Sequence, residues 1–130
     1  MTNEQIKKAF EIFKKEIKKE AGLAYGFTMN RKQIEKRTAT YLVCNTIDID
    51  REIADTEKSL ETARSKDWWM ERLEVLKARK ERFGSKENEL KETVKIIENS
   101  KAFSKFTETI GKTELTTEEN DNCYYIRFNY

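Results

Sequence analysis

The absence of proline constrains this chain more than any other feature: none of its 130 residues is proline, and only four are glycine. Proline breaks helices and glycine weakens them, so a chain with so few of either can form long, uninterrupted helices. Hydrophobic residues make up 37% of the sequence, which is above the content of a disordered chain even though 38% of the residues are charged. We therefore expect a single folded domain, residues 1–130, that is mainly helical.

The composition also excludes several kinds of active site. The sequence has no histidine, which rules out histidine-dependent catalytic triads and histidine-ligated zinc. Cys44 and Cys123 are far apart and lack the C-x-x-C spacing of a zinc or redox motif. With 26 Lys and Arg against 24 Asp and Glu, the net charge of +2 gives no overall attraction to polyanions. We expect the protein not to be an enzyme and to have no catalytic residue, metal or cofactor.

The first 29 residues predict a helix followed by a short strand. Thr2 and Gln5 fit a capping box, and Gly22 fits a helix C-terminus. Between them, apolar residues recur every three or four positions, at Ile6, Phe10, Phe13 and Ile17. Residues 23–29 then alternate apolar with small residues, which is the period of a strand.

Residues 30–99 predict a long antiparallel helical hairpin. Apolar or small residues recur at spacings of three and four over residues 34–60 and again over residues 69–97. We interpret each series as one helix, the first of about 35 residues and roughly 50 Å long at about 1.5 Å per residue. A turn at residues 65–67 brings the two series face to face. The facing pairs near the turn are Leu60 with Leu73 and Thr56 with Leu76.

The second series continues in register through Gly84, although several polar residues lie on this part of the seam. We expect the helix to continue through Gly84; a break there, giving a three-helix bundle, is the main alternative. Further along, Ser100 and Gly111 fit the two ends of a short helix. Residues 112–130 then predict a β-hairpin with a polar turn.

These elements together predict a mainly α, α+β fold with a long antiparallel, coiled-coil-like helical hairpin on a small head. The hairpin arm spans residues 30–99. The head, residues 1–29 and 100–130, contains the N-terminal helix, the short helix and an antiparallel sheet of two or three strands.

The two tryptophans, Trp68 and Trp69, are neighbours at the predicted tip of the hairpin. Adjacent helical residues point about 100° apart, so only Trp69, which is in phase with the apolar series, can enter the seam. Trp68 then faces outward beside Met70 and Arg72, and Trp and Arg dominate binding hot spots. The predicted partner-binding residues are therefore Trp68, Trp69, Met70 and Arg72. The alternatives are that Trp68 caps the tip of the hairpin, or that it mediates self-association.

The N-terminal third carries most of the positive charge. Residues 1–41 hold ten Lys and Arg against five Asp and Glu. Under an alternative function in nucleic-acid binding, the residues that would follow a phosphate backbone are Arg31, Lys32, Lys36 and Arg37. The same pattern is also typical of a solvated helix surface, and a third interpretation is binding to a membrane surface.

Two other charged segments have structural explanations. The basic run over residues 77–86 lies opposite the acidic residues 48–55 in the predicted hairpin, so we expect ion pairs between them. Asp48, Glu52 and Asp55 share a helix face, but they lack the glycine of a calcium-binding loop. A metal site is therefore not favoured.

A long hairpin offers reach and a rigid surface, which favours binding over turnover. We expect a non-enzymatic protein–protein interaction module, a small regulator or inhibitor from a phage or mobile element that acts on a host enzyme through the hairpin. The alternative is a nucleic-acid-binding module. A homodimer is also considered, because Tyr41, Ile47 and Val75 lie outside the seam and a four-helix arrangement would cover them. No signal-peptide pattern or long apolar run occurs, so we expect a cytoplasmic protein without a membrane span.

Overall fold

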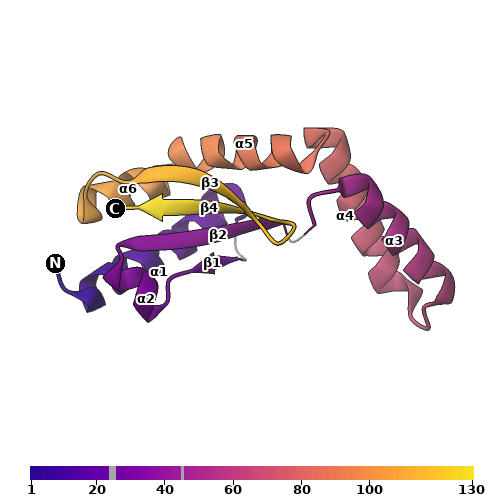
Figure 1. The fold of residues 1–130 in the computed structure, drawn as a ribbon, viewed down its shortest axis with the longest axis horizontal. Coiled ribbons are helices and arrows are strands. Elements are labelled where there is room, and N and C mark those ends of the chain that lie inside the picture. Colours follow the sequence, from indigo (N-terminus) through magenta and orange to yellow (C-terminus); the bar gives the residue numbers. More distant parts are fainter. Residues whose placement is uncertain (24–25, 45) are drawn as a thin grey trace.

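The computed structural model describes residues 1–23, 26–44 and 46–130, and it confirms an α+β fold. Figure 1 shows two parts, a head that contains the sheet and an arm that projects from one end of it. The six helices and four strands in the described residues are α1 (Asn3–Ala21), β1 (Phe27–Thr28), α2 (Arg31–Glu35), β2 (Thr38–Cys44), α3 (Ile49–Thr62), α4 (Lys66–Phe83), α5 (Lys86–Glu98), α6 (Lys101–Ile110), β3 (Glu114–Asn120) and β4 (Cys123–Asn129).

Helix α1 confirms the prediction made from its capping and apolar pattern. The Thr2 hydroxyl accepts a hydrogen bond from the Gln5 backbone N–H, and the Gln5 side chain accepts one from the Thr2 backbone. Gly22 ends the helix in the left-handed conformation, with φ of 73°. The buried residues of the helix are the predicted set, Ile6, Phe10, Phe13 and Ile17.

The sheet of the head has four strands in the order β1-β2-β4-β3, all antiparallel, where the sequence predicted two or three. The strand expected over residues 23–29 is shorter, since only Phe27–Thr28 pairs with β2, and residues 24 and 25 lie outside the described residues. The C-terminal β-hairpin is confirmed as β3 and β4. It turns at Asp121 and Asn122, both with positive φ, as two-residue hairpin turns require.

The prediction of one helix from residue 30 to residue 65 is wrong. The chain forms the short helix α2, which ends at Glu35, turns at Arg37 with φ of 57°, and continues as strand β2. The sequence of β2, TATYLVC, is rich in β-branched and aromatic residues, which favour strands. Its buried residues Ala39, Tyr41 and Cys44 are spaced by two and then three, because a bulge at Val43 shifts the register.

The expected continuity through Gly84 is also wrong, and the alternative of a break at this residue is confirmed. Gly84 has φ of 79°, so the helix ends at Phe83. Ser85 then caps a new helix, α5, by accepting a hydrogen bond from the Asn88 backbone N–H at 3.1 Å. Helix α5 packs on the head through Leu90 and Ile97, so no three-helix bundle forms.

The long coiled-coil hairpin is therefore not confirmed, and the arm consists of α3 and α4 alone. Thr56 and Leu76, which were expected to face each other, are both buried. The expected ion pairs between the two charged segments form between Asp50 and Lys80 and between Glu52 and Lys86. Glu52 also pairs with Arg72 of α4, which lies outside the predicted basic run. These contacts keep the two helices antiparallel (Figure 1).

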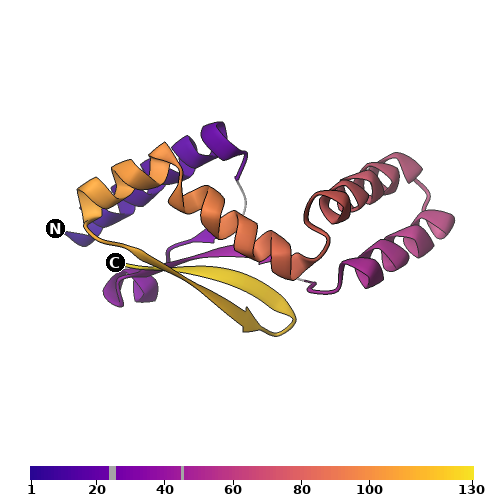
Figure 2. The ribbon, with the colours of Figure 1, turned by 90° about the horizontal axis from the view of Figure 1, so that it is seen from above.

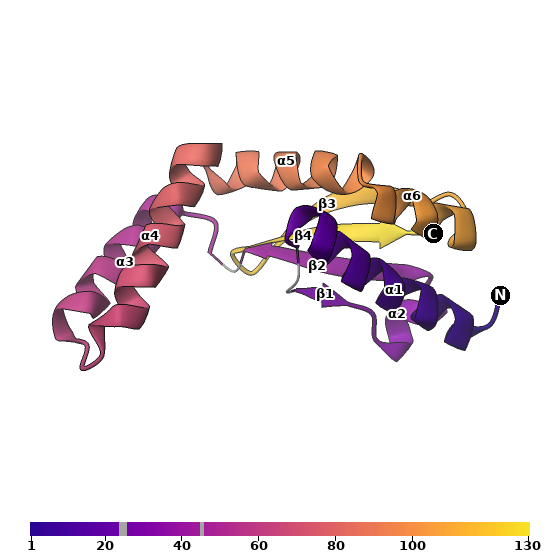
Figure 3. The same cartoon turned by 180° about the vertical axis from the view of Figure 1, so that it is seen from behind.

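The core of the protein lies between the helices and one face of the sheet. Figure 2 shows α1, α5 and α6 on one side of the sheet. In Figure 3, which views the molecule from behind, α1 lies in front of the sheet. Phenylalanines from both layers meet edge to face, with the Phe13 ring 5.6 Å from Phe27 and 5.7 Å from Phe128. The short helix α6 is also as predicted, since Ser100 caps it and Gly111 follows it. Among the described helices, only the short α2 contacts the other face of the sheet, through the hydrogen bond from Gln33 to Thr40.

Candidate functional site

One face of α4 combines arginines with exposed apolar residues. Trp68, Arg72, Val75, Arg79 and Arg82 follow one another at spacings of four, three, four and three, which places them on one side of a helix. The side chain of Trp68 is 59% exposed and that of Val75 is 47% exposed. We call these five residues the α4 stripe.

The α4 stripe separates the four predicted partner-binding residues. Trp68 and Arg72 belong to it, whereas Trp69 is in phase with Leu76, which is buried against α3. Met70 is exposed but lies about 200° around the helix from Trp68, so it faces the opposite side. The helix thus brings Trp68 and Arg72 together, whereas Trp69 faces the seam with α3 and Met70 lies on the opposite side of α4.

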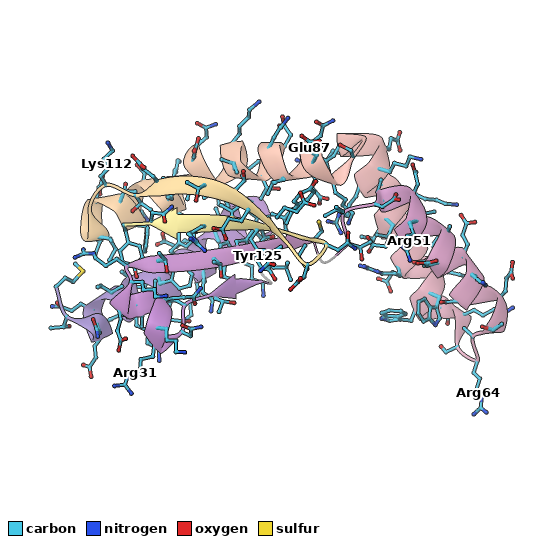
Figure 4. The ribbon with its side chains drawn as sticks, in the orientation of Figure 1. Arg31, Arg51, Arg64, Glu87, Lys112 and Tyr125 are labelled. Atoms are coloured by element: carbon cyan, nitrogen blue, oxygen red, sulfur yellow. The ribbon has the colours of Figure 1, made fainter. Side chains whose placement is uncertain are left out.

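The two indoles contact each other at the arm's end. Their ring centroids are 4.7 Å apart and their planes are perpendicular, an edge-to-face arrangement. Trp69 is half-buried, as expected for a residue in the seam. Among the described residues, Trp68 makes no cation–π contact, and Arg64 projects into solvent at the tip (Figure 4).

The α4 stripe borders a cleft of about 670 Å³ between the arm and the head. Arg72, Val75, Arg79 and Arg82 line its arm side, and residues of α5, of β2 and around the end of α1 line the head side. Its charged lining comprises four cations, the three arginines and Lys86, and two carboxylates, Glu52 and Glu89. The cleft is therefore electropositive.

A buried lysine lies at the junction of arm and head. The Lys86 side chain is 2% exposed, and its Nζ lies 3.1 Å from Oε2 of Glu52, which is 12% exposed. The two groups attract each other without an aligned hydrogen bond, since Oε2 of Glu52 has no hydrogen-bond partner among the described residues. Arg72 donates to the other oxygen, Oε1, at 2.6 Å. Glu52 therefore holds two cations.

A second ion pair crosses the same junction. Arg79 of α4 donates to Oε1 of Glu89 from Nε at 2.7 Å, and its Nη2 lies 2.6 Å from the same oxygen. Because Lys86 and Glu89 belong to α5, both pairs tie the arm to the head. The α4–α5 connection at Gly84 is thus fixed by side-chain contacts on both sides of the bend.

Two titratable groups form the floor of the cleft. Burial raises the pKa of the Cys44 thiol, an effect that the nearby Lys86 ammonium partly offsets. Burial also raises the pKa of the Tyr41 phenol, and the Glu89 carboxylate adds to the rise. Both groups are therefore neutral at pH 7, and Cys44 supplies no thiolate nucleophile.

The four predicted nucleic-acid-binding residues are also divided by the structure. Arg31 lies 3.6 Å from Glu35 and projects away from the head (Figure 4). The Arg37 Nε donates to the backbone oxygen of Tyr130 at 3.2 Å. Only Lys32 and Lys36 remain together, at a small polar pocket on the open face of the sheet.

The acidic residues of α3 act in the structure of the helix. Asp48 caps α3 by accepting a hydrogen bond from the Arg51 backbone N–H, and Asp55 lies 4.0 Å from the Arg51 side chain. Glu52 is held by the two cations described above. Within residues 1–23, 26–44 and 46–130, no group of three or more acidic, cysteine or histidine side chains is arranged to hold a metal ion.

Sequence reasoning missed Val75, Arg79 and Arg82 as members of the site, because they lay outside the seam of the predicted hairpin. Their spacing from Trp68 was the available signal, since all of them share its helical phase. Tyr41 is buried in the head, and the continuous hairpin that the four-helix dimer requires is not formed. None of the helices in the described part of the chain is long and apolar enough to cross a membrane.

Comparison with known proteins finds no significant match to this chain. No protein-family model matches the chain, and no curated protein and no solved structure shows significant similarity to it.

Proposed function

We propose that this protein is a non-enzymatic interaction module that binds an acidic segment of another protein along the α4 stripe. The observation that carries the proposal is the exposure of Trp68 and Val75 on the helix face whose arginines line the cleft. Exposed aromatic and arginine side chains are the residues that most often dominate protein–protein binding energy. Val75 lies between Arg72 and Arg79, and Trp68 stands at one end of the stripe, which suits a partner with an apolar residue between carboxylates.

The dimensions of the site fit a short peptide segment. From Trp68 to Arg82 the α4 stripe is about 21 Å long, at about 1.5 Å per helical residue. A partner strand advances about 3.3 Å per residue, so six or seven extended residues follow the stripe from end to end. The four cations and two carboxylates of the cleft lining give the complementary charge.

A protein suits the α4 stripe better than a nucleic acid does. Arg72 and Arg79 are each within 2.7 Å of a carboxylate, so their charges are already partly neutralised. A surface that follows a phosphate backbone needs cations that release its counterions. The exposed apolar area of Trp68 and Val75 instead calls for an apolar partner group. The proposal includes the regulator or inhibitor role, because a protein that acts by covering its partner's surface needs no catalytic group.

Selection from a library of random peptides of about 12 residues, long enough to cover the α4 stripe, tests the proposal. We expect the wild-type protein to enrich peptides with an apolar residue between Asp or Glu. Trp68→Ala should weaken the selected peptide by about 30-fold, the loss of a hot-spot anchor worth about 2 kcal/mol. Met70→Ala is the matched control, since it removes a side chain of similar exposure, 50% against 59%, from the opposite face of the same helix.

Charge reversal tests the acidic character of the partner separately. Arg82 forms no ion pair among the described residues, so Arg82→Glu changes the charge of the cleft without breaking an ion pair; the internal contact that it removes is the cation–π contact with Phe83, whose ring centroid lies 4.8 Å from the guanidinium. We expect this variant to bind the selected peptide at least tenfold more weakly, while Lys77→Glu on the opposite face has little effect. Equal binding by Trp68→Ala and Met70→Ala, or selection of peptides without acidic residues, would contradict the proposal.

A further inference from the structure

The open face of the sheet carries a second, separate polar pocket. It has a volume of about 250 Å³ and lies between α2 and strands β2 and β4. Its lining consists of Asn30, Lys32, Gln33, Lys36, Thr38, Thr40 and Arg127. It therefore contains three cations, two hydroxyl groups and two amides, and no carboxylate. Because Lys32 and Lys36 are one helical turn apart, both point to the same side of α2.

Internal hydrogen bonds hold the polar wall of this pocket in place. Gln33 Nε2 donates to the Thr40 hydroxyl at 3.1 Å, and the Gln33 side-chain oxygen accepts from the Asn30 backbone N–H at 2.8 Å. The two lysines have no acidic partner within 4 Å among the described residues. Their ammonium groups are thus available to a ligand, unlike the paired cations of the arm cleft.

Arg127 is the one cation of the pocket with a partner. Its Nη2 lies 2.9 Å and 3.0 Å from the two carboxylate oxygens of Glu118 on β3. Both side chains are partly exposed, so this pair contributes little stability, and the guanidinium retains further N–H groups for an anion. Glu114, the other acidic residue of β3 on this face, lies 3.9 Å from Lys112.

An aromatic side chain stands beside the pocket on the same face of the sheet. Tyr125 precedes Arg127 by two positions on β4, and the intervening Ile126 is buried in the core. Residues two apart on a strand point to the same face and are about 7 Å from each other. Tyr125 is labelled on the uncovered face of the sheet in Figure 4.

The geometry points to a binding site for single-stranded nucleic acid on this open face. Lys32, Lys36 and Arg127 contact a backbone phosphate in the pocket, and a neighbouring base stacks on Tyr125. Phosphate is the anion that matches three cations and the Thr40 hydroxyl around one pocket, whereas the Thr38 hydroxyl donates to the Gln33 backbone oxygen at 3.5 Å. The partly exposed ring of Tyr125 on the sheet is a stacking platform for an unpaired base. A base-paired duplex does not fit, because its bases are not free to stack on the sheet.

Fluorescence anisotropy with a labelled, mixed-sequence single-stranded DNA of about 12 nucleotides tests the inference. With three phosphate contacts, the logarithm of the association constant K for the DNA should fall with the logarithm of the salt concentration at a slope of about −2. Binding should therefore be roughly 16-fold weaker at about 200 mM salt than at about 50 mM salt. The double variant Lys32→Gln/Lys36→Gln should reduce the slope to about −0.7. Tyr125→Ala should weaken binding about tenfold, and Tyr125→Phe should retain it.

A charge-matched control separates this site from general electrostatic attraction. Lys15 and Lys19 are exposed on α1, on the other side of the sheet, and have the same spacing as Lys32 and Lys36. Lys15→Gln/Lys19→Gln should leave both affinity and slope unchanged, with circular dichroism confirming that every variant is folded. The inference is overturned by equal effects of the two double variants, by equal binding of the annealed duplex, or by an absence of binding. Displacement of the DNA by inorganic phosphate alone, with no effect of Tyr125→Ala, would also overturn it.

Discussion

Removing the Glu52 carboxylate tests whether a buried ion pair fixes the junction of arm and head. Lys86 is 2% exposed and, among the described residues, has Glu52 as its one carboxylate within 4 Å. Glu52→Gln therefore leaves a buried ammonium without a counterion. Breaking a buried pair in this way costs about 3 kcal/mol of unfolding free energy or more.

The reverse substitution should cost much less. Lys86→Met removes the ammonium but leaves Glu52 paired with Arg72 at 2.6 Å, so no buried charge is orphaned. We expect it to cost about 1 kcal/mol, and the double variant Glu52→Gln/Lys86→Met to cost about the same. The double-mutant cycle then gives a coupling of about 3 kcal/mol between the two residues. Arg72 is partly exposed, so water solvates its charge when Glu52 is neutralised.

Urea unfolding measures all three variants, because urea, unlike guanidinium chloride, does not screen ion pairs. Both tryptophans lie in the arm, so their fluorescence follows the arm while far-UV circular dichroism follows the whole chain. Coincident transitions would justify a two-state treatment. Equal losses in the two single variants, or a double variant that loses the sum of both, would refute the asymmetry that the structure implies.

The other predictions concern the head, the bend and the arm's end. The Glu20 carboxylate accepts hydrogen bonds from the backbone N–H groups of Lys101 and Ala102, and these lower its pKa, so its stabilisation is full at neutral pH and is lost as the pH falls through that lowered pKa. Melting temperatures of wild type and Glu20→Gln should accordingly differ at pH 7 and converge in acid; a difference that does not vary with pH would contradict this. Gly26→Ala should destabilise more than Gly84→Ala in urea, because both glycines have positive φ but only at Gly26 would the added Cβ lie 2.8 Å from the Leu42 carbonyl oxygen. Backbone strain alone predicts about 1 to 3 kcal/mol for Gly84→Ala, and equal losses at the two sites would be inconsistent with the close contact. Trp68→Ala should change the unfolding free energy by about 1 kcal/mol or less, as for an exposed residue with one edge-to-face aromatic contact, whereas a clearly larger loss would mean that Trp68 is structural.

The parts of the fold that could be predicted from sequence carry local signals that agree with their packing. Helix α1 has a capping box, an apolar stripe and a C-terminal glycine, and α6 has a cap and a stop as well. The β3–β4 hairpin has alternation and a polar turn. In each case the propensity, the period and the end signals indicate the same element, so no knowledge of the remaining chain was needed.

Strand β2 was missed because Ile34, Thr38 and Tyr41 are spaced by four and three, which fits a helical series. In the strand the buried residues are instead Ala39, Tyr41 and Cys44, and the bulge at Val43 obscures their alternation by making the last step three. At Gly84 the error had another cause. Gly84 and Ser85 carry a helix stop and a helix start side by side, and the regular apolar spacing was given more weight than these signals.

The candidate sites depend on contacts that sequence periodicity does not contain. Trp68 and Arg72 were predicted, but the cleft exists only because α5 turns back onto the head after Gly84. Likewise, Lys32 and Lys36 were predicted, but Arg127 joins them through the pairing of β2 with β4. Both sites are formed by residues far apart in the chain. The predicted long hairpin placed these residues in different parts of the molecule.

Photo-crosslinking from the α4 stripe tests most directly whether a protein segment occupies the cleft. A photoreactive benzoylphenylalanine replaces either Val75, which lines the cleft, or Lys77, which lies on the opposite face of α4. Each protein is irradiated with the peptide selected on the wild type, and the crosslinked residues are mapped by mass spectrometry. Our account predicts a crosslink from position 75 to the acidic peptide and none from position 77. Equal crosslinking at both positions, or crosslinking from position 77 alone, would contradict it.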